Sequence, residues 1–193
     1  TTLKEEGIKF IDGGVSGGLE AARHGASLTI GGDKNVFKKI EFLFRNLAAK
    51  NGYGYVGNSG AGHFAKLIHN GIEYALLEAY GEGFEILNKS EYKFNLKEIA
   101  RIWNNGSIIR SYLTELIEKI FEKNKNLKGT DGIIRGGESG KWAYSIAKKS
   151  SIEFGSLKYA LQKRKLSEKK QSFSSKLISL IRHEFGGHAT KEK

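Results

Sequence analysis

The sequence predicts a mixed fold in which a short α/β segment precedes a longer helical one. Two observations lead to this prediction. Up to about residue 58, short runs of β-forming residues alternate with a helical pattern and are bounded by glycine pairs. From Ser59 onward, apolar residues recur at three- and four-residue spacing, as on one face of a helix. The charge is a separate feature: residues 1–100 hold twelve Lys/Arg and twelve Asp/Glu, whereas residues 101–193 hold twenty and nine, so the second half should attract an anion.

The α/β segment begins with short elements. Lys9 to Asp12 is predicted as a strand that leads into a loop at Gly13–Gly18, because a run so rich in glycine favours turns. Leu19 to His24 is long enough for one or two helical turns. Ala26 to Ile30 is predicted as a second strand, which ends at the next glycine pair.

Asp33 is predicted to cap a helix that runs to about Ala49, because apolar residues follow it at helical spacing. Tyr53 to Val56 is predicted as a last short strand. These strands are too few for a complete α/β sheet, so the segment is predicted to be a fragment of one.

The remainder is predicted to be helical. The expected helices span about Ala61–Asn88, Leu96–Lys123, Trp142–Lys149 and Phe154–Phe185, the last broken near Ser167–Ser172. The stretch Asn124–Gly140 is rich in Gly, Asn and Lys and is predicted to be a loop.

Composition limits the class of protein. With 39% hydrophobic and 11% aromatic residues, the chain can bury a core. It has no apolar run near the ~18 residues that a membrane helix needs and no secretory leader, so we expect a soluble, cytoplasmic protein with no membrane partner. Without cysteine there is no disulfide or thiolate chemistry. The net charge of +11 predicts either an anionic partner or a solvated basic face.

Three motif matches are weak. Gly52–Gly57 fits G-x-G-x-x-G but lies on a predicted strand rather than in a strand-to-helix turn. Gly14–Gly18 fits the nucleophile elbow G-x-S-x-G, which also needs a histidine and an acid in contact. His183 and His188 are one residue too far apart for a zincin helix, so we expect no metal site.

One helix face is chemically richer. At ~100° per residue, five polar residues share an arc of about 140°; they are Lys66, His69, Asn70, Glu73 and Tyr74. The opposite face is small and apolar, as expected for a helix that packs closely against its neighbours; it holds Ile68, Gly71, Ile72, Ala75 and Ala79. A solvated face with a Glu–Lys pair is the plain alternative.

Several segments resemble the 6-phosphogluconate dehydrogenases (decarboxylating), in their shorter bacterial and archaeal branch. They are Ile11–Gly18 (IDGGVSGG), Leu28–Gly32 (LTIGG), Gly60–Tyr74 (GAGHFAKLIHNGIEY), Trp103–Ser111 (WNNGSIIRS), Glu138–Trp142 (ESGKW) and Arg182–His188 (RHEFGGH). The resemblance implies that residues 1–58 are the end of a Rossmann-like nucleotide-binding domain and that residues 59–193 are an all-helical substrate-binding and dimerisation domain.

The resemblance also implies an activity: oxidation of 6-phosphogluconate and its decarboxylation to ribulose 5-phosphate, in the pentose phosphate pathway, with NAD or NADP as co-substrate. Most of the cofactor-binding half, including the true glycine fingerprint, is expected to lie outside these residues. We therefore expect this chain to be inactive alone. The strand that distinguishes NAD from NADP is expected to lie outside these residues, so the resemblance does not indicate which cofactor is used.

By the same resemblance, Lys66 is the base that takes the C3 hydroxyl proton and Glu73 is the acid that later protonates the enediol. Substrate would be bound by Ser16, Gly17, Gly18, His69, Asn70, Tyr74, Arg110, Lys141, Arg182 and His188. The family draws its last Arg and His from the second subunit, so Arg182 and His188 are expected to act across a homodimer.

Two other readings remain open. A β-hydroxyacid dehydrogenase relative would share Val15–Gly18 and the lysine helix, although Arg110, Lys141 and Arg182 favour a phosphorylated substrate. A non-enzymatic basic module would bind anions or nucleic acid through Lys158–Lys176, although few aromatic residues interrupt that run, which disfavours nucleic acid.

Overall fold

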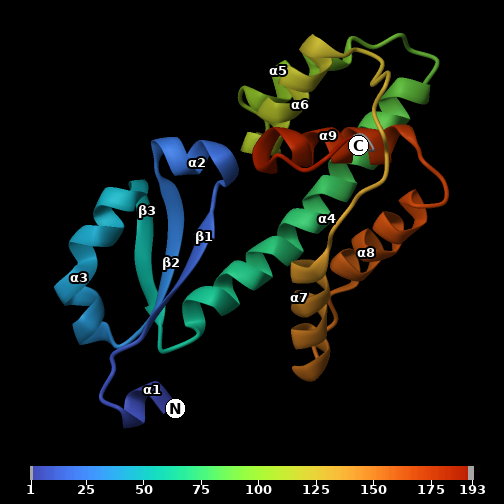
Figure 1. Ribbon diagram of the computed structural model, residues 1–193. Helices are drawn as coiled ribbons and strands as arrows, with labels where there is room; N and C mark the ends of the chain where they lie inside the picture. The colour runs from blue at the N-terminus through green and yellow to red at the C-terminus, as the bar shows by residue number, and fades with distance from the viewer. Residues whose placement is uncertain (1, 191–193) are drawn as a thin grey trace. The chain divides into compact units, whose positions relative to one another are not determined.

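The computed structural model describes residues 2–190, which form two compact units that are joined within one long helix. The first unit ends at Gly71 and the second begins at Ile72. The first contains α1 (Thr2–Glu5), β1 (Ile11–Ser16), α2 (Gly18–His24), β2 (Ala26–Gly32), α3 (Lys34–Leu47), β3 (Ala48–Gly57) and the start of α4 (Ala61–Lys89). The second contains the rest of α4, α5 (Leu96–Asn104), α6 (Tyr112–Lys123), α7 (Glu138–Lys149), α8 (Gly155–Ser167) and α9 (Phe173–Gly186), as labelled in Figure 1.

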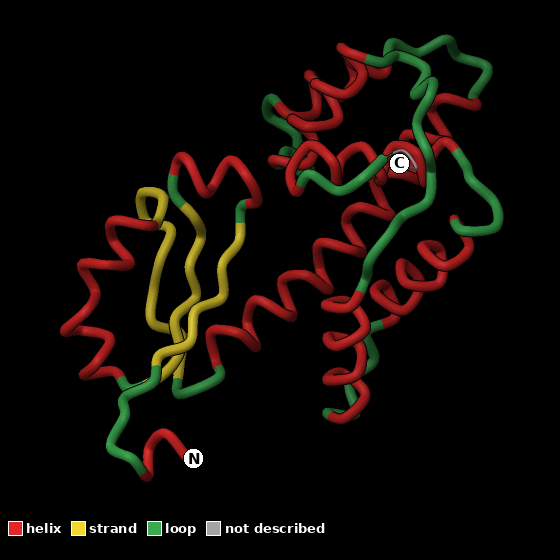
Figure 2. The backbone as a smooth tube through the Cα atoms, viewed as in Figure 1, coloured by secondary structure: helices red, strands yellow, loops and turns green. Residues whose placement is uncertain are grey.

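In the first unit, the described strands form one sheet in the order β1-β2-β3 (Figure 2). β1 runs antiparallel to β2, and β2 runs parallel to β3. Ile30 and Phe37 are buried where α3 packs against the sheet, and the Phe37 ring stacks on that of Phe44. The predicted mixed fold, an α/β piece followed by helices, is confirmed.

The first strand differs from its prediction. β1 starts at Ile11 and continues through the glycines to Ser16, where a loop is predicted. Gly13 and Gly14 pair with Ile30 and Thr29 of β2. A Cβ on Gly14 would lie 2.5 Å from the carbonyl oxygen of Gly62 and 2.5 Å from the Cβ of Lys66. The glycine is therefore needed for the close approach of α4 to the strand, not for a turn.

The Asp33 cap is confirmed. Its side chain accepts hydrogen bonds from the backbone N–H groups of Asn35 (2.8 Å) and Val36 (3.2 Å). These bonds lower the pKa of the Asp33 carboxyl group. The helix ends at Leu47 rather than Ala49, and β3 begins directly after it, so this strand is longer than the predicted Tyr53–Val56.

A buried carboxylate attaches the first turn of α4 to the sheet. Asp12 is 2% exposed and accepts hydrogen bonds from the backbone N–H groups of Gly60 (2.6 Å) and His63 (2.8 Å). The His63 ring lies 3.4 Å from the same carboxylate, and the Thr29 hydroxyl donates to the carbonyl of Gly62. The start of α4 thus packs with the sheet, whereas the predicted domain boundary after residue 58 stays a prediction.

Replacing Asp12 by alanine is expected to lower the free energy of unfolding by about 2–3 kcal/mol, because it leaves backbone donors at the start of α4 without an acceptor. Asp33→Ala is the matched control: it removes an exposed cap and should lower the free energy of unfolding by less than Asp12→Ala does. Urea unfolding of both variants measures the difference. Equal losses would show that Asp12 has no special role in holding α4.

The second unit is built around α4, α6 and α9. Its core contains Phe84 of α4, Ile117 and Phe121 of α6, and Leu177 and Ile181 of α9. α9 approaches α4 closely: a Cβ on Gly81 would lie 2.6 Å from the hydroxyl oxygen of Ser174. No helix among residues 2–190 is long and apolar enough to cross a membrane.

The predicted helix Leu96–Lys123 is wrong, because residues 105–111 interrupt it. α5 ends at Asn104, and Ser111 caps α6 by accepting from the N–H of Thr114. The hydroxyl of Tyr80, on α4, donates to the carbonyl of Ile109 at 2.6 Å. Gly106 has φ of +96°, a conformation that only glycine adopts without strain. This tertiary hydrogen bond and the turn outweigh the helical periodicity.

The other helix limits are closer to prediction. The predicted break near Ser167–Ser172 is confirmed, and Ser172 begins α9 with a capping box to Ser175. α7 begins at Glu138, earlier than the predicted Trp142, after Gly137 at φ of +132°. The predicted loop from Asn124 is present and ends at Gly137.

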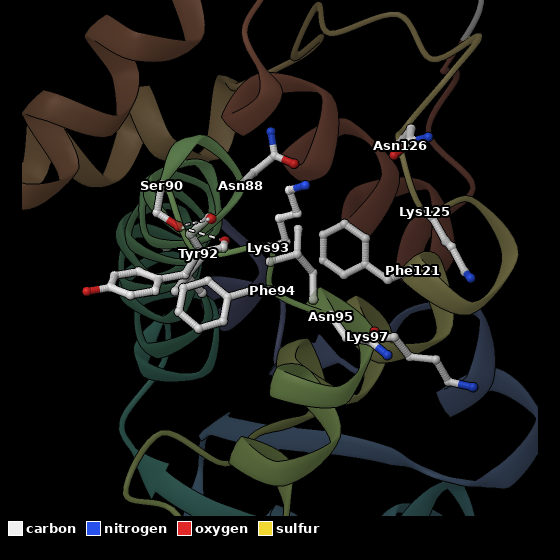
Figure 3. Close-up of a pocket in the computed structure, with 12 residues that line it drawn as sticks. Asn88, Ser90, Tyr92, Lys93, Phe94, Asn95, Lys97, Phe121, Lys125 and Asn126 are labelled. Carbon is white, nitrogen blue, oxygen red and sulfur yellow. Dashed lines mark hydrogen bonds between the residues drawn. The ribbon is translucent and has the colours of Figure 1, made fainter.

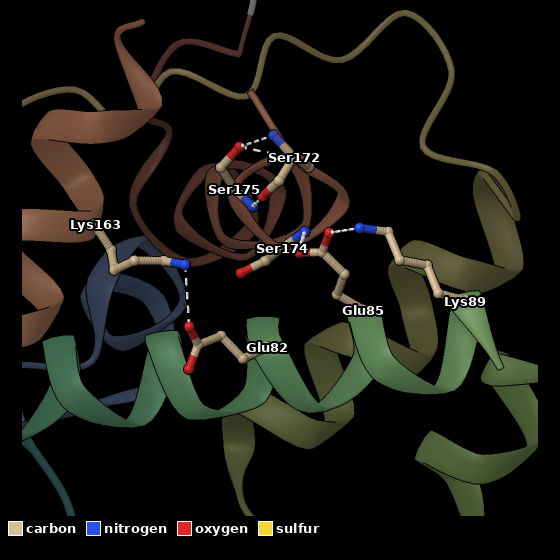
Figure 4. A network of polar contacts seen from close by, with 7 residues as sticks. All are labelled: Glu82, Glu85, Lys89, Lys163, Ser172, Ser174 and Ser175. Atoms are coloured by element: carbon tan, nitrogen blue, oxygen red, sulfur yellow. Dashed lines mark hydrogen bonds and ion pairs between the residues drawn. The ribbon is translucent and has the colours of Figure 1, made fainter. Parts of the chain in front are cut away.

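Polar contacts join α4 to the two C-terminal helices (Figure 4). Glu82 accepts hydrogen bonds from Tyr159 (2.6 Å) and Lys163 (3.1 Å), both on α8. Glu85 accepts from the backbone N–H of Ser174 at the start of α9 and pairs with Lys89. The second half of α4 is therefore the element against which α8 and α9 pack.

Candidate active site

The predicted polar face of α4 is a real cluster in the first unit. Lys66 Nζ lies 3.3 Å from His69 Nδ1, and the other ring nitrogen of His69 lies 3.2 Å from the hydroxyl of Ser16. The amide oxygen of Asn70 lies 3.2 Å from His69 Nδ1. Lys66 is half-buried and His69 is exposed. A cation, an imidazole, a hydroxyl and an amide from β1 and α4 thus face one accessible region.

Gly17 and Gly18 follow Ser16 directly. They have φ of +125° and +64°, values that L side chains rarely adopt. Gly17 is the N-cap of α2, and a Cβ there would lie 2.3 Å from the Cβ of Ala21. Glycine is therefore required for the chain to turn from β1 into α2 beside the Ser16 hydroxyl.

Glu73 lies two turns after Lys66 on the same face of α4, as the helical repeat requires. It is half-buried. The opposite face was predicted to be packed, and this is wrong for two of its residues: Gly71 is buried, but Ile72 is 50% exposed and Ala79 is also exposed. The buried face in the second unit contains Leu77, Gly81 and Phe84.

Tyr74 begins a second cluster, which lies entirely in the second unit. It is buried, and its hydroxyl lies 3.2 Å from that of Ser139 in the first turn of α7. The guanidinium carbon of Arg164, on α8, lies 3.9 Å from the centre of the Tyr74 ring. This is a cation–π contact between the guanidinium group and the ring.

Arg164 and Arg182 are two buried cations in this cluster. Arg164 is 7% exposed, and its buried Nη1 has no hydrogen-bond partner among residues 2–190. Arg182, on α9, is 5% exposed; burial and the charge of Arg164 lower its pKa to about 10. Arg182 therefore stays charged at neutral pH. Buried like charges and an unpaired guanidinium nitrogen are costly without an anion, so this cluster can bind one.

His188 completes the cluster. It follows Gly187, which ends α9 in the left-handed conformation. Burial, together with the positive charges of Arg182 and Arg164, lowers the pKa of His188, so it is neutral at pH 7 and offers one N–H donor. The His183 ring donates to the carbonyl of His188 at 2.8 Å. The part of the chain that the structure describes contains no group of three or more residues able to hold a metal ion.

Arg164 is a candidate functional residue that sequence reasoning missed. By sequence it belongs to the basic run Lys158–Lys176, which is a candidate binding segment only in the non-enzymatic alternative. A signal was present, however, because Arg164 stands at helical spacing from Leu157 and Ala160, on the apolar stripe of α8, and all three are buried. A cation in an apolar stripe points to a buried ligand or counter-ion.

Two predicted phosphate ligands are not brought into this cluster. Arg110 is exposed in the 105–111 loop. Lys141 is exposed and pairs with Glu138 at 3.1 Å, although its neighbour Gly140 is packed against the Tyr74 ring. Within the described residues, no hydrogen bond or ion pair joins either cation to Tyr74, Arg164 or Arg182. Their binding roles stay predictions.

The expectation that Arg182 and His188 act across a homodimer stays a prediction. Within one chain, the packing of α9 on α4 brings Arg182 near Tyr74 and Arg164. Burial lowers the pKa of Arg182, and the charge of Arg164 lowers it further. A Cβ on Gly136 would be 3.7 Å from the Arg182 guanidinium.

The G-x-G-x-x-G match does not form a cofactor cradle. Gly52–Gly57 lies within β3, as predicted, and not in the strand-to-helix turn that holds a pyrophosphate. Gly52–Gly57 therefore does not supply the phosphate-binding turn of a dinucleotide site.

Comparison with protein families assigns both parts of the chain. Residues 62–191 match the C-terminal domain of 6-phosphogluconate dehydrogenase, and residues 1–57 match the NAD binding domain of 6-phosphogluconate dehydrogenase. The chain belongs to the 6-phosphogluconate dehydrogenase family. The resemblance carried by the motifs is thus confirmed, as is the order of a Rossmann-like start and a helical C-terminal domain.

Individual relatives agree with this assignment. The 6-phosphogluconate dehydrogenase relative YqeC of Bacillus subtilis is 44% identical over 99% of this chain. The NAD(+)-dependent, decarboxylating 6-phosphogluconate dehydrogenase of Haloferax volcanii is 38% identical over 95% of it. This chain spans 64% and 62% of the lengths of these two proteins.

Solved structures are similar as well. Plasmodium falciparum 6-phosphogluconate dehydrogenase, studied with NADP+ and with 6-phosphogluconate, matches 86% of this chain and 38% of its own, with a TM-score of 0.76 and 28% identity. A Salmonella typhimurium 3-hydroxyisobutyrate dehydrogenase matches 91% of this chain and 62% of its own, with a TM-score of 0.69 at 15% identity, which shows a common fold.

Proposed function

We propose that this chain provides the proton-transfer and substrate-binding residues of an enzyme that oxidatively decarboxylates 6-phosphogluconate to ribulose 5-phosphate with NAD or NADP. The observation that carries this proposal is the buried arginine pair Arg164 and Arg182 beside Tyr74. Membership of an oxidoreductase family supports the chemistry, and the arginine pair supports a phosphorylated substrate.

The substrate phosphate is proposed to be held in the second unit. Arginine suits this role because its planar guanidinium donates two parallel hydrogen bonds to phosphate oxygens. Arg164 has a buried nitrogen without a partner, and Arg182 is the second cation of the pair. Tyr74 and neutral His188 add donors. A dianionic phosphate would also remove the repulsion between the two guanidinium groups.

The sugar-acid end of the substrate is proposed to lie at the β1–α4 cluster. Ser16 supplies a hydroxyl and the turn at Gly17 and Gly18 supplies backbone N–H groups for the carboxylate. His69 and Asn70 hold the substrate hydroxyls. Their contacts with one another and with Lys66 orient these groups before substrate binds.

Lys66 is proposed to act as the general base. In its neutral form it takes the proton of the C3 hydroxyl while the C3 hydride leaves, and it then donates that proton to the 3-keto oxygen as CO2 departs. A nicotinamide cofactor, when bound, accepts the hydride. Glu73 is proposed to donate a proton to the carbon that carried the lost carboxylate, while Lys66 takes back the proton of the enediol hydroxyl so that the ketone forms. One base and one acid on a single helix face suit these two stages.

Ligand binding to the 193-residue chain tests the proposal. Calorimetry should show 6-phosphogluconate binding about 100-fold more tightly than gluconate, because the phosphate adds two or more charge-assisted hydrogen bonds. The β-hydroxyacid alternative instead predicts that 3-hydroxyisobutyrate binds best. The basic-module alternative predicts that 6-phosphogluconate and other sugar phosphates bind with similar affinities, and that these affinities fall together as salt is added.

A homodimer is also proposed, on the basis of apolar side chains that the second unit leaves exposed. They are Ile72, Leu76, Ile102, Ile108 and Trp142. Exposed apolar surface of this kind favours association. Sedimentation at micromolar concentration should give a dimer, and Ile72→Lys with Leu76→Lys should give a monomer. A wild-type monomer would contradict the proposal without affecting the phosphate cluster, which one chain assembles.

A further inference from the structure

A cavity of ≈ 390 Å³ lies in the second unit, away from the Tyr74 cluster (Figure 3). It is formed where α4 ends, around the connection to α5 and beside the end of α6. Leu87, at its edge, is about 20 Å along α4 from Tyr74. The cavity is large enough for a small organic ligand. None of the residues that line it is used in the proposed reaction.

One part of the cavity lining is positively charged. Lys93, Lys97 and Lys125 line the cavity. Lys97 pairs with Glu122 at 2.7 Å, but in residues 2–190 neither Lys93 nor Lys125 makes a hydrogen bond or ion pair. The side-chain amides of Asn88 and Asn126 also lie at the cavity without a hydrogen bond within that range. Two ammonium groups and two amides are thus available to a ligand.

The rest of the lining is aromatic. Phe94 is 44% exposed although its ring lies at the cavity, and it forms a tilted pair with Tyr92, with ring centres 5.7 Å apart. Phe121 is fully buried and forms part of the wall. An exposed aromatic pair beside unpaired lysines suits a ligand that has both a flat ring and a strong negative charge.

We propose that this cavity binds a nucleoside phosphate. The base stacks on Phe94, the amides of Asn88 and Asn126 bind its polar edge or the ribose, and the phosphates pair with Lys93 and Lys125. Stacking on an aromatic ring accepts any base, whereas the lysines require the phosphates. A free phosphate or a nucleoside alone would use only one part of the lining.

Calorimetry with the full chain and adenosine diphosphate tests this proposal. Adenosine diphosphate should bind at least ~10-fold more tightly than inorganic phosphate, which cannot stack on Phe94, and than adenosine, which cannot pair with the lysines. The double variant Lys93→Gln, Lys125→Gln should weaken binding by ~10-fold or more, and Phe94→Ser should also weaken it. The double variant Lys169→Gln, Lys170→Gln, in the exposed turn after α8, is the charge-matched control and should bind normally.

The location of the site is tested by Arg164→Met, which should leave adenosine diphosphate binding intact. The proposal is overturned if the Lys93/Lys125 variant binds as the wild type does, or if the control pair weakens binding equally. It is also overturned if inorganic phosphate or adenosine binds as tightly as the diphosphate, or if Arg164→Met abolishes binding. Thermal unfolding of each variant checks that it is folded.

Discussion

Replacing Lys66 by methionine is expected to lower kcat by ~10²–10⁴-fold, the usual contribution of a positioned general base. The measurement requires an enzyme in which these residues follow a functional nucleotide-binding half. Methionine keeps the length and apolar body of the lysine side chain but cannot take the C3 hydroxyl proton. KM should change less, because the phosphate remains bound by Arg164 and Arg182.

Lys89→Met is the control on the same helix, since Lys89 is an exposed lysine that pairs with Glu85. It should leave kcat unchanged. If Lys66 served only as a surface ion-pairing group, its loss would cost about 0.3–0.5 kcal/mol of stability and little activity. Near-normal turnover of Lys66→Met would therefore defeat its assignment as the base.

Glu73→Gln should fail at a later step than Lys66→Met. The first turnover should still reduce the nicotinamide, because Glu73 acts only after the hydride and CO2 have left. Rapid-mixing measurements should show this burst, followed by slow product formation. If Glu73→Gln instead abolished the burst, Glu73 would not be an acid of the second stage.

Arg164→Met is expected to raise the KM for 6-phosphogluconate by about 100-fold, the value of two lost charge-assisted hydrogen bonds. Lysine at this position should recover only part of the loss, because an ammonium group does not form the same paired hydrogen bonds. kcat should change little if the phosphate interaction is the same in the ground state and the transition state.

Two further measurements test whether the rise in KM is specific to the loss of Arg164. Arg110→Met and Lys141→Met should raise KM much less than Arg164→Met, since the structure leaves both residues outside the Tyr74 cluster. Without ligand, Arg164→Met should not lower the free energy of unfolding, because an apolar side chain replaces one of two buried like charges. If Arg110→Met had the larger effect on KM, or if Arg164→Met were strongly destabilised, the proposed phosphate site would be wrong.

Local signals in the sequence were sufficient for part of the fold and part of the candidate site. Asp33 begins a helix because its own side chain caps the next N–H groups. The arc from Lys66 to Tyr74 follows from the helical repeat alone, and the structure finds Lys66, His69 and Asn70 in contact on it. Such features depend on residues a few positions apart, so their spacing in the sequence contains the information.

Only the tertiary structure decided the rest. The glycines of β1 form a strand because β2 pairs with them and α4 packs on Gly14. The long helix after Leu96 breaks because Tyr80, from another helix, binds Ile109. Arg164 is buried against the Tyr74 ring instead of being exposed on the basic surface, because α8 packs on α4. The sequence by itself determined which helix carries the candidate polar face, through spacing. The partners of the buried cations depended on contacts between distant segments, which spacing does not encode.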